Sequence, residues 1–401
     1  MASKRVAVIG ASGYGGLQTL RLLQGHPGLE VSFLGGERSS GKRWSELTPF
    51  LPLPGDPVVQ APDPDAIAAA ADLAVLSLPN GLASRLVPPL LERGVKLAYH
   101  SWAAQPIVVD GAVQGVTFES KEGRMALMAK VVVDATGDGD LFARAGAAFD
   151  NDIEEADVHH CMNTAWLFAG VDMGRWIDFK AGQPDAFNAF MSKGREACGL
   201  FERPFVSWRN DVALFMGPRQ TGYSALDVDD LTEVEVRSHR AMEKHLAFYR
   251  AHAPGFENAY MMVSAPQIGV RHARRLKGVD AVLRTRWPDG VPLPDEVGVT
   301  PSVSPKFPNI SIPYGALVPQ ALDGLLACGR HISCDKNSHG FMREIPQCWI
   351  TGQAAGVAAA LAVRDGVQPR NVSIAHLQEA LLAQGVYLRR SEEHTSELQS
   401  H

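Results

Sequence analysis

Several features that would assign a protein class directly are missing from this chain. It has five cysteines, none in a C-x-x-C pair, which argues against a disulfide framework and a zinc knuckle. Its longest apolar stretch, residues 354–363, is too short to span a bilayer. A net charge of -6 without a basic run gives no reason to expect a nucleic acid or a membrane as partner. We expect no metal site, and a small molecule as the partner.

The amino terminus also lacks an apolar signal region, because MASKRVAVIG leads directly into an expected strand. This favours a reduced, cytoplasmic compartment. The composition, 46% hydrophobic and 20% charged, is typical of a soluble globular protein. With 401 residues, two or three domains are expected, and the oligomeric state stays open.

The stretch VVVDATGDGDLFARAGAAF, residues 131–149, predicts a strand, a glycine-rich turn and a helix. Gly137 and Gly139 lack a Cβ, so the backbone can turn sharply and a bulky group can approach it. This order of elements is a common place to hold a nucleotide. An ordinary strand-to-helix turn explains the same residues equally well. Before it, Asp110-Gly111 between alternating apolar runs predicts a β-hairpin within a meander.

The first hundred residues predict a Rossmann-like βαβ unit. A strand at residues 5–9 is followed by Gly10, Gly13 and Gly16, which open a helix. The G-x-x-G-x-x-G spacing suits a turn that admits a pyrophosphate.

The loop after the second expected strand favours one dinucleotide over another. Glu37 could accept a hydrogen bond from a ribose hydroxyl, as NAD requires. Arg38, Ser39, Ser40 and Lys42 offer cations and hydroxyls that suit a 2′-phosphate, so NADP is expected. A solvated polar loop is the alternative for each of these side chains.

The last third predicts a second group of nucleotide contacts. Gly329 and Arg330 turn the chain at a strand end, and a helix is expected to open with Gly352, Gln353 and Gly356. Its free backbone N–H groups and positive dipole end would then face a ligand.

Candidate catalytic and substrate residues flank this region. Four side chains of the polar loop could handle a proton or bind substrate, with a structural role as the alternative: His331, His339, Arg343 and Cys348. Three arginines of IGVRHARRLKG, about one helical turn apart, could bind a phosphate or carboxylate, with a solvated basic helix face as the alternative: Arg271, Arg274 and Arg275.

Residues 6 to about 96 resemble the NADP domain of N-acetyl-gamma-glutamyl-phosphate reductase, an arginine-biosynthesis enzyme. VAVIGASGYGG, the RSSGK loop and ADLAVLSLPNGLAS carry this resemblance. In that family a thioester-forming cysteine in a Gly-Cys-Tyr-Pro context follows the domain. No cysteine here has that context, so the catalytic half is missing.

Residues from about 92 to about 388 resemble the FAD-dependent oxidoreductases of the fumarate-reductase-like superfamily. DATGDGD with ARAGA, and GR followed by P-x-C-W-x-T-G-Q-A-A-G, carry this resemblance. It implies hydride transfer from a small organic substrate to flavin. It also implies that FAD is contacted by Gly137, Gly329, Arg330, Gln353 and Gly356, with the arginines at 268–278 beside the flavin.

The chain departs from this family at both ends. Such flavoproteins begin with their own strand, G-x-G-x-x-G turn and helix, and a reductase-type unit stands here instead. FAD is therefore expected to bind weakly or not at all. Residues 390–401, RSEEHTSELQSH, are expected to be disordered and resemble a translated sequencing adapter. A catalytically inactive chimera is therefore a third interpretation, beside the flavin oxidoreductase and the reductase.

These patterns predict an α/β protein in which a Rossmann-like dinucleotide-binding unit is joined to an incomplete FAD-binding domain with an inserted substrate domain. The substrate domain is expected to be helical with few strands, and His239 and His245 to face solvent. The expected ranges are 1–96 for the Rossmann unit, 97–149 and 309–389 for the FAD domain, 150–308 for the substrate domain and 390–401 for the tail.

Overall fold

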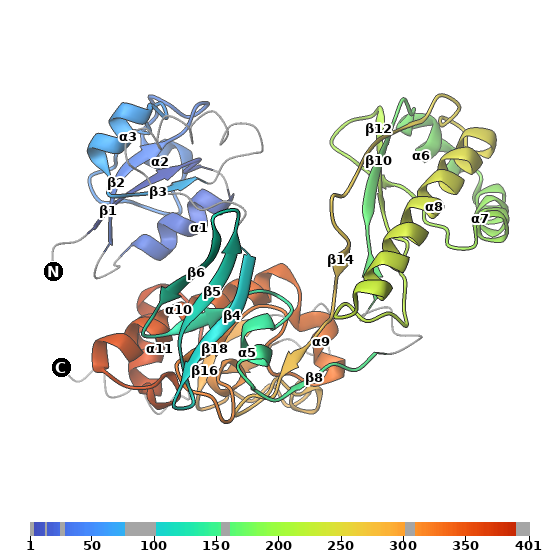
Figure 1. Cartoon of the computed structure of the whole chain (residues 1–401). Coiled ribbons are helices and arrows are strands. Elements are labelled where there is room, and N and C mark those ends of the chain that lie inside the picture. The colour runs from blue at the N-terminus through green and yellow to red at the C-terminus, as the bar shows by residue number, and fades with distance from the viewer. Residues whose placement is uncertain are drawn as a thin grey trace.

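The structure, a computed structural model, describes residues 4–12, 14–24, 29–76, 102–153, 161–300 and 309–389. Gly13, the predicted tail at 390–401 and the junction near residue 96 lie outside the described residues. The described elements form three groups: an N-terminal parallel sheet with its helices, a central group, and an inserted antiparallel sheet with long helices (Figure 1).

The N-terminal group is the predicted Rossmann-like unit. Its strands pair in parallel in the order β2-β1-β3. Side chains of β1 alternate between two cores, with Val6 and Val8 packing on one face and Ala7 and Ile9 on the other. Its elements are β1 (Lys4–Ile9), α1 (Tyr14–Leu23), β2 (Leu29–Gly35), α2 (Trp44–Leu47), α3 (Pro64–Ala70) and β3 (Leu73–Leu76).

The central group combines the predicted meander with a parallel pair of strands. The meander turns through Asp110 and Gly111, which both have positive φ, as the hairpin prediction requires. β7 pairs in parallel with β18, Val132 opposite Leu325. The meander and this pair are β4 (Trp102–Val109), β5 (Ala112–Ser120), β6 (Gly123–Met128), β7 (Val132–Asp134) and β18 (Leu325–Ala327).

Helices cover the parallel pair and fill the largest core. Ala354, Ala355 and Ala358 of α10 are fully buried there beside Leu326 of β18. The other elements of the group are α5 (Asp140–Arg144), η1 (Arg284–Arg286), β16 (Glu296–Thr300), β17 (Ile310–Pro313), η2 (Tyr314–Leu317), α9 (Lys336–Met342), α10 (Ile345–Asp365), η3 (Pro369–Asn371) and α11 (Ile374–Ala383).

The inserted domain contains more strand than the sequence suggested. A four-stranded antiparallel sheet runs in the order β11-β12-β10-β13, so the prediction of few strands was wrong. Trp166 and Phe215 stack in its core with ring centroids 5.1 Å apart. Its elements are β10 (Ala165–Ala169), α6 (Met173–Gly182), α7 (Pro184–Cys198), β11 (Phe205–Val206), β12 (Val212–Met216), α8 (Val228–His252) and β13 (Tyr260–Ser264).

Two histidines of α8 differ in their surroundings. His239 is exposed, as predicted, but His245 is fully buried, so its predicted solvent exposure was wrong. Its Nε2 accepts a hydrogen bond from the backbone N–H of Glu202 at 2.8 Å, and its Nδ1 lies 2.6 Å from the carbonyl oxygen of Ala241. The proton therefore resides on Nδ1 of a neutral ring. Burial lowers the pKa of His245 to about 4.

Short strands connect the inserted domain to the central group. They are β8 (Phe149–Asp150) with β15 (Arg275–Leu276), and β9 (Met162–Asn163) with β14 (Gly269–Val270). Figure 1 shows the chain around β14 running between the two groups. No helix within the described ranges is both long and apolar enough to cross a membrane.

Candidate functional site

The loop after β7 is shaped by a carboxylate that the fold itself uses. Asp134 is fully buried and accepts four hydrogen bonds. Two come from the backbone N–H and hydroxyl of Thr136, at 3.0 and 2.7 Å. The others come from the N–H groups of Leu141 and Phe142, at 3.0 and 2.9 Å, at the start of α5. A negative charge is favourable at this helix end. Asp134 therefore fixes the turn between β7 and α5.

Two arginines from distant segments hold the rest of this loop. Arg330 Nη2 donates to Asp138 Oδ1 at 2.7 Å. Arg274 Nη1 donates to the carbonyl oxygen of Asp138 at 2.9 Å and to Asp140 Oδ1 at 3.1 Å. Gly137 has φ 84°, and a Cβ there would lie 2.7 Å from Nη1 of Arg330. Only glycine fits this position, and the arginine fills the space that it leaves.

The end of β18 adds two predicted residues to the same place. Gly329 has φ 97° and open space where a Cβ would stand, and its N–H donates to Thr351 Oγ1 at 3.0 Å. His331 is fully buried, with Nε2 3.0 Å from the carbonyl oxygen of Asp134. Because a carbonyl oxygen only accepts, Nε2 carries the proton. His331 thus ties β18 to β7, which is a structural role.

The predicted opening of a helix at Gly352 was wrong. Helix α10 begins at Ile345, with Glu344 as N-cap and a proline in its first turn. Gly352 and Gly356 therefore lie inside the helix, where backbone N–H groups bond to carbonyls one turn earlier. Gln353 Nε2 donates to Gln384 Oε1 of the segment after α11, at 3.0 Å. Open space remains outside both glycines, but contact of these three residues with FAD stays a prediction.

The three arginines at 271–275 do not form the helix face considered as an alternative, because β14 and β15 flank an irregular segment. Arg274 binds the loop after β7, as described above. Arg275 is 3% exposed and forms an ion pair with Asp152 at 2.9 Å. Arg274 and Arg275 are therefore bound to groups of the fold itself, and the place of Arg271 is described next.

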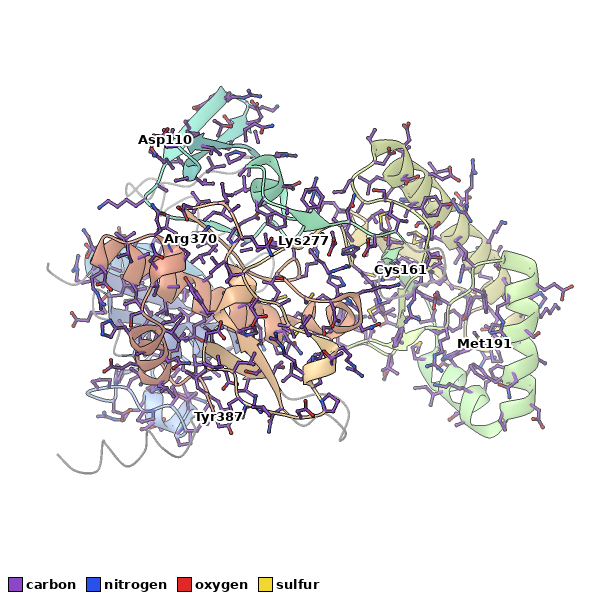
Figure 2. All side chains as sticks on the ribbon, turned by 90° about the horizontal axis from the view of Figure 1, so that it is seen from below. Asp110, Cys161, Met191, Lys277, Arg370 and Tyr387 are labelled. Atoms are coloured by element: carbon purple, nitrogen blue, oxygen red, sulfur yellow. The ribbon has the colours of Figure 1, made fainter. Side chains whose placement is uncertain are left out.

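Arg271 lies on a ribbon of three chain segments together with Arg219, which was not predicted from the sequence. Met162 of β9 pairs with Val270 on one side and bridges Gln220 on the other. Continuing this antiparallel register puts Arg271 opposite Cys161, and Arg219 opposite Asn163. Since neighbouring side chains point to opposite faces, Cys161, Arg219 and Arg271 belong to one face. Figure 2 shows Cys161 where the inserted domain meets the rest of the molecule.

Charges concentrate on this face, which we call the arginine face: Cys161, Glu202, Arg219, Arg271 and Arg343. Burial raises the pKa of the Cys161 thiol, while Arg271, Arg219 and Arg343 oppose that shift. Burial also lowers the pKa of Arg343, and the like charge of Arg271 adds to the effect. Burial raises the pKa of Glu202, against which Arg219 acts. The predicted residues Arg343 and Arg271 are therefore close together.

The predicted His339 lies in the same region. It is fully buried, and its ring packs edge-to-face against His272, with centroids 4.8 Å apart. His272 adjoins Arg271 in sequence, and its Nε2 lies 3.4 Å from Nη1 of Arg275. The structure therefore brings His339, Arg343 and Arg271 together, whereas His331 belongs to the strand ends.

The N-terminal unit carries its own nucleotide turn. Gly10 has φ 81°, and its N–H donates to the carbonyl oxygen of Gly35 at 2.8 Å. A Cβ on Gly16 would lie 2.1 Å from the carbonyl oxygen of Gly10, so α1 can approach the turn only with glycine there. Ser12 Oγ lies 3.3 Å from Ser39 Oγ, which brings the predicted phosphate loop beside the turn.

Arg38 and Lys42 fit a phosphate. Both are exposed, and within the described part of the chain neither forms an ion pair. The loop that carries them is fixed, because the N–H of Gly41 and the carbonyl oxygen of Lys42 both bond to the backbone of Val59, at 2.8 and 2.9 Å. The residues present therefore fit NADP.

The fit to FAD is incomplete. In the described ranges the parallel sheet of the central group has two strands, β18 and β7, and the N-terminal strands form a sheet of their own. No glycine turn therefore stands on a strand beside β7 in this part of the chain. Gly137, Gly329 and Arg330 fit the flavin end of the cofactor, but a place for its pyrophosphate is missing among them.

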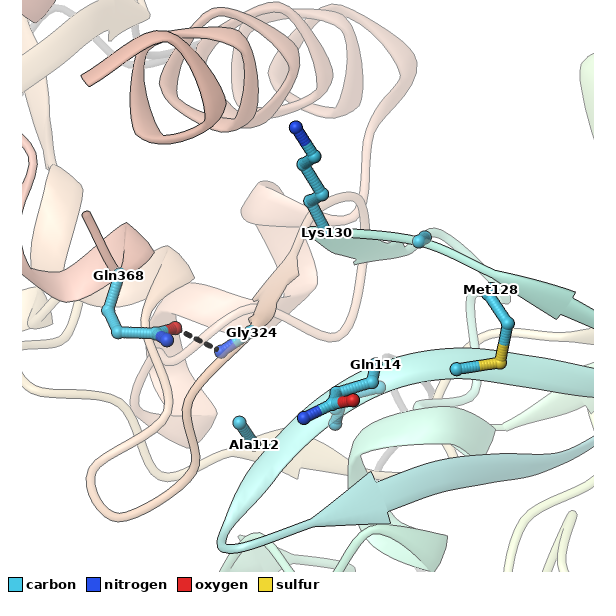
Figure 3. A pocket seen from close by; sticks show the side chains of 8 residues that line it. Ala112, Gln114, Met128, Lys130, Gly324 and Gln368 are labelled. Carbon is cyan, nitrogen blue, oxygen red and sulfur yellow. Dashed lines mark hydrogen bonds between the residues drawn. The ribbon is translucent and has the colours of Figure 1, made fainter. Parts of the chain in front are cut away.

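One surface cavity near this sheet lies at the wrong end for a cofactor. A surface cavity of about 500 Å³ lies between β5, the start of β7 and the residue before β18. It is lined in part by Lys130 and Gly324, whose N–H donates to Gln368 Oε1 at 3.0 Å (Figure 3). These residues precede β7 and β18. Parallel sheets bind ligands at the carboxyl ends of their strands, so this cavity is not a candidate site.

Comparison with protein families gives two matches. The model of the FAD dependent oxidoreductase family matches residues 60–381. The model of the semialdehyde dehydrogenase NAD binding domain matches residues 5–104. Together they support FAD and NADP as the cofactors of the two parts.

Individual relatives match the first quarter. The N-acetyl-gamma-glutamyl-phosphate reductase of Synechococcus sp. (strain CC9605) is 75% identical over 93 residues, 23% of this chain and 26% of that protein. The same enzyme of Parasynechococcus marenigrum (strain WH8102) is 73% identical over 93 residues, again 23% and 26% of the two chains. The chain thus spans about a quarter of the length of these curated relatives.

Among solved structures, the flavin-dependent brominase Bmp2 aligns with 13% identity and a TM-score of 0.35, over 95% of this chain and 83% of that one. Aspartate semialdehyde dehydrogenase with NADP from Candida albicans aligns with 27% identity and a TM-score of 0.23, over 28% of this chain and 34% of that one.

Proposed function

Because the chain belongs to the family of FAD-dependent oxidoreductases, we propose that its reaction is hydride transfer from a small organic substrate to flavin. The observation that carries this proposal is that two arginines close together in the sequence contact the loop after β7 and the arginine face. Arg274 binds the loop after β7, and three residues earlier Arg271 lies on the arginine face. A substrate on that face would therefore lie near a flavin bound at Gly137 and Gly329. FAD, when bound, supplies the hydride acceptor.

The chain's own residues would bind and orient the substrate. Arg343 and Arg271 supply positive charge, and His339 lies beside His272 at the base of the same group. His339 is the candidate for proton transfer, since an imidazole can both donate and accept a proton. We assign His331 to the fold, because its Nε2 proton is used between the two strand ends.

We also propose that this chain holds FAD weakly. The N-terminal strands form a separate sheet beside Arg38 and Lys42, which suit another cofactor. The strand next to β7, on which the family's first glycine turn would stand, has no counterpart in the described residues. Several charge-assisted hydrogen bonds to the pyrophosphate are then lost.

The test is to mix the purified protein with FAD, remove the free ligand and record the flavin absorbance. A colourless folded protein is expected. Stoichiometric FAD would contradict weak binding and would strengthen the oxidoreductase assignment. Turnover of small organic substrates with added FAD and an artificial electron acceptor then tests hydride transfer itself.

The second candidate is the acyl-phosphate reductase suggested by the first quarter, and the structure disfavours it. That reaction needs a thiolate nucleophile. Burial raises the pKa of all five cysteines, to about 11 for Cys328 and about 12 for Cys334. We therefore propose that the chain does not reduce N-acetyl-gamma-glutamyl phosphate with NADPH. Turnover that is lost on changing one cysteine to serine would contradict this.

A chimera without activity remains a further proposal, favoured by one observation. The resemblance to the reductases ends near residue 96, close to where the flavoprotein resemblance begins, and within the described residues the two parallel sheets are not joined. The two family matches overlap at residues 60–104. Reading one uninterrupted DNA molecule across these codons decides between a natural fusion and an assembly product.

A further inference from the structure

We propose that the arginine face binds a carboxylate of the substrate, between Arg219 of the ribbon and Arg343 at the end of α9. That this carboxylate belongs to a substrate rests on the proposed oxidoreductase function, whereas the binding of a carboxylate does not depend on it. Arg219 was not among the residues that sequence reasoning selected, and it reaches the site only through the bridge between Met162 and Gln220.

The ribbon register supplies the geometry. Gln220 exchanges both backbone hydrogen bonds with Met162, at 2.8 and 3.0 Å, so Arg219 is held in register beside β9. Its side chain belongs to the same face as Cys161, whereas Gln220 points to the other face, where its Nε2 donates to the carbonyl oxygen of Val234 at 3.0 Å. A substitution at Arg219 therefore changes the polar face and leaves the buried contacts of Gln220 in place.

One donor on this face has no acceptor among the described residues. The Nε of Arg343 is buried and has no hydrogen-bond partner in the part of the chain that the structure describes. Its ion pair is with Glu344 at 3.3 Å, through Nη1, and the Glu344 side chain is 51% exposed. A buried unsatisfied donor is costly, and a planar oxyanion would satisfy it with two parallel hydrogen bonds.

Glu202 selects among anions. A Cβ on Gly217 would lie 2.5–2.7 Å from the end of the Glu202 side chain, so this carboxyl lies against the segment that leads into Arg219. Its negative charge offsets one of the cations and would repel a phosphate dianion more than a carboxylate. Burial opposes its ionisation, but Arg219 and Arg271 favour the charged form. A carboxylate with a single charge therefore suits the site better than a phosphate.

The experiment uses the full chain without FAD, so that binding is measured apart from any turnover. Acetate, succinate and inorganic phosphate are titrated calorimetrically at constant ionic strength. The variants are Arg219→Gln and Arg219→Lys, which keeps the charge but loses the planar fork. Arg209→Gln is the matched control, because Arg209 is an exposed arginine of the same domain whose ion pair with Asp211 at 2.7 Å lies outside the site.

We expect saturable carboxylate binding that Arg219→Gln weakens about tenfold or more, the loss expected for a charge-assisted pair of hydrogen bonds. Arg219→Lys should lie between wild type and Arg219→Gln, and Arg209→Gln should match wild type. An unchanged unfolding curve for Arg219→Lys would show that its loss of binding is local. Absence of carboxylate binding to wild type, equal weakening by Arg209→Gln, or tighter binding of phosphate would overturn the inference.

The same experiment separates this inference from the proposed function. Carboxylate binding that depends on Arg219, in a protein that shows no flavin turnover, would uphold the site and remove the oxidoreductase assignment. Turnover of a substrate that lacks any anionic group, at a rate unaffected by Arg219→Gln, would uphold the oxidoreductase and remove this site.

Discussion

The two nucleotide regions of this molecule are built from the same element order but differ in what their polar groups do. After β1, the Gly10 turn stands in a three-stranded sheet, and exposed Arg38 and Lys42 form no ion pairs in the described part of the chain. After β7, the turn stands in a two-stranded sheet, and Asp138 is bound by Arg274 and Arg330. A strand, a glycine turn and a helix therefore do not suffice for a cofactor site.

The difference lies in the neighbouring strand. In the first unit, Gly35 at the end of β2 accepts the hydrogen bond of Gly10, and the loop after β2 brings Ser39 to Ser12 of the turn. Beside β7, the described strand is β18, which brings Arg330 and His331 instead. A binding site is thus completed by the loops of adjacent strands, and among the residues that the structure describes the first unit alone has both of its loops.

The largest difference expected between the two regions is in their affinity for cofactors. We expect FAD to bind at least about a hundredfold more weakly than NADP, since two or three absent charge-assisted hydrogen bonds at about 1.5–3 kcal/mol each amount to about 3 kcal/mol or more. Calorimetric titration of both cofactors measures it. Gly16→Ala, which sets a Cβ 2.1 Å from Gly10 O, is the control. It should remove NADP binding only, and equal loss of both would show that FAD uses the first turn.

The next largest effect is expected on local stability, when the buried carboxylate of Asp134 in the second turn is removed. Asp134→Ala leaves the N–H groups of Leu141 and Phe142 without their acceptor, and should cost about 3 kcal/mol of local stability. Asp63→Ala removes a single cap contact, to the N–H of Ala66 at 2.8 Å, and should cost about 1 kcal/mol. Hydrogen exchange of peptides covering α5 and α3 measures both. Equal protection losses would mean that Asp134 is not the main anchor of its turn.

The cations of the first unit predict a change in cofactor preference. The double substitution Arg38→Ala with Lys42→Ala should weaken NADP binding tenfold to a hundredfold, about 1.5–3 kcal/mol, and leave NAD binding nearly unchanged. Arg43→Ala is the matched control, because the exposed Arg43 forms an ion pair with Asp56 at 3.7 Å. Titration of NADP and NAD against each variant decides it. A parallel loss of both affinities would show that the loop holds the common part of the dinucleotide.

Local sequence patterns correctly predicted the strands and turns whose formation depends on residues close together in the sequence. Alternating apolar residues and the Gly10 turn defined the first unit, and Asp110-Gly111 defined the hairpin between β4 and β5. The start of α10 was signalled by the proline in its first turn, but the later glycines were given more weight. Glycines inside that helix were mistaken for its beginning.

The remaining features depend on contacts between distant segments, which a single sequence does not display. β10 pairs with β12 and β13, which follow it only after long helical segments, so its short apolar run gave no clear strand signal. Arg219 comes near Arg343, and Glu202 near Arg219, only through the ribbon around β9. Arg274 and Arg275 were predicted to bind a phosphate or carboxylate of the substrate, and in the structure they pair with the carboxylates of Asp140 and Asp152.

The smallest expected effect is a loss of stability in acid. It should arise in the inserted domain and in neither of the nucleotide regions. His245 of α8 has a pKa of about 4 in the fold against 6.5 for the free side chain, because it is buried. Between pH 6.5 and pH 4 the His245 ring is protonated in the unfolded chain but stays neutral in the folded protein. Its stabilising contribution is therefore complete above pH 6.5 and is lost as pH falls toward 4. Between pH 7 and pH 5 the loss should be about 1–2 kcal/mol.

Urea unfolding at pH 7 and pH 5 measures this loss, followed by hydrogen exchange in α8, α3 and α5. His245→Gln keeps an acceptor for the N–H of Glu202 but cannot titrate, so its stability should change less between the two pH values, although it starts lower. Glu202, whose pKa is raised by burial, remains in both proteins. If α3 or α5 lost protection before α8 on acidification, the acid-sensitive group would lie in a nucleotide region and not in the inserted domain.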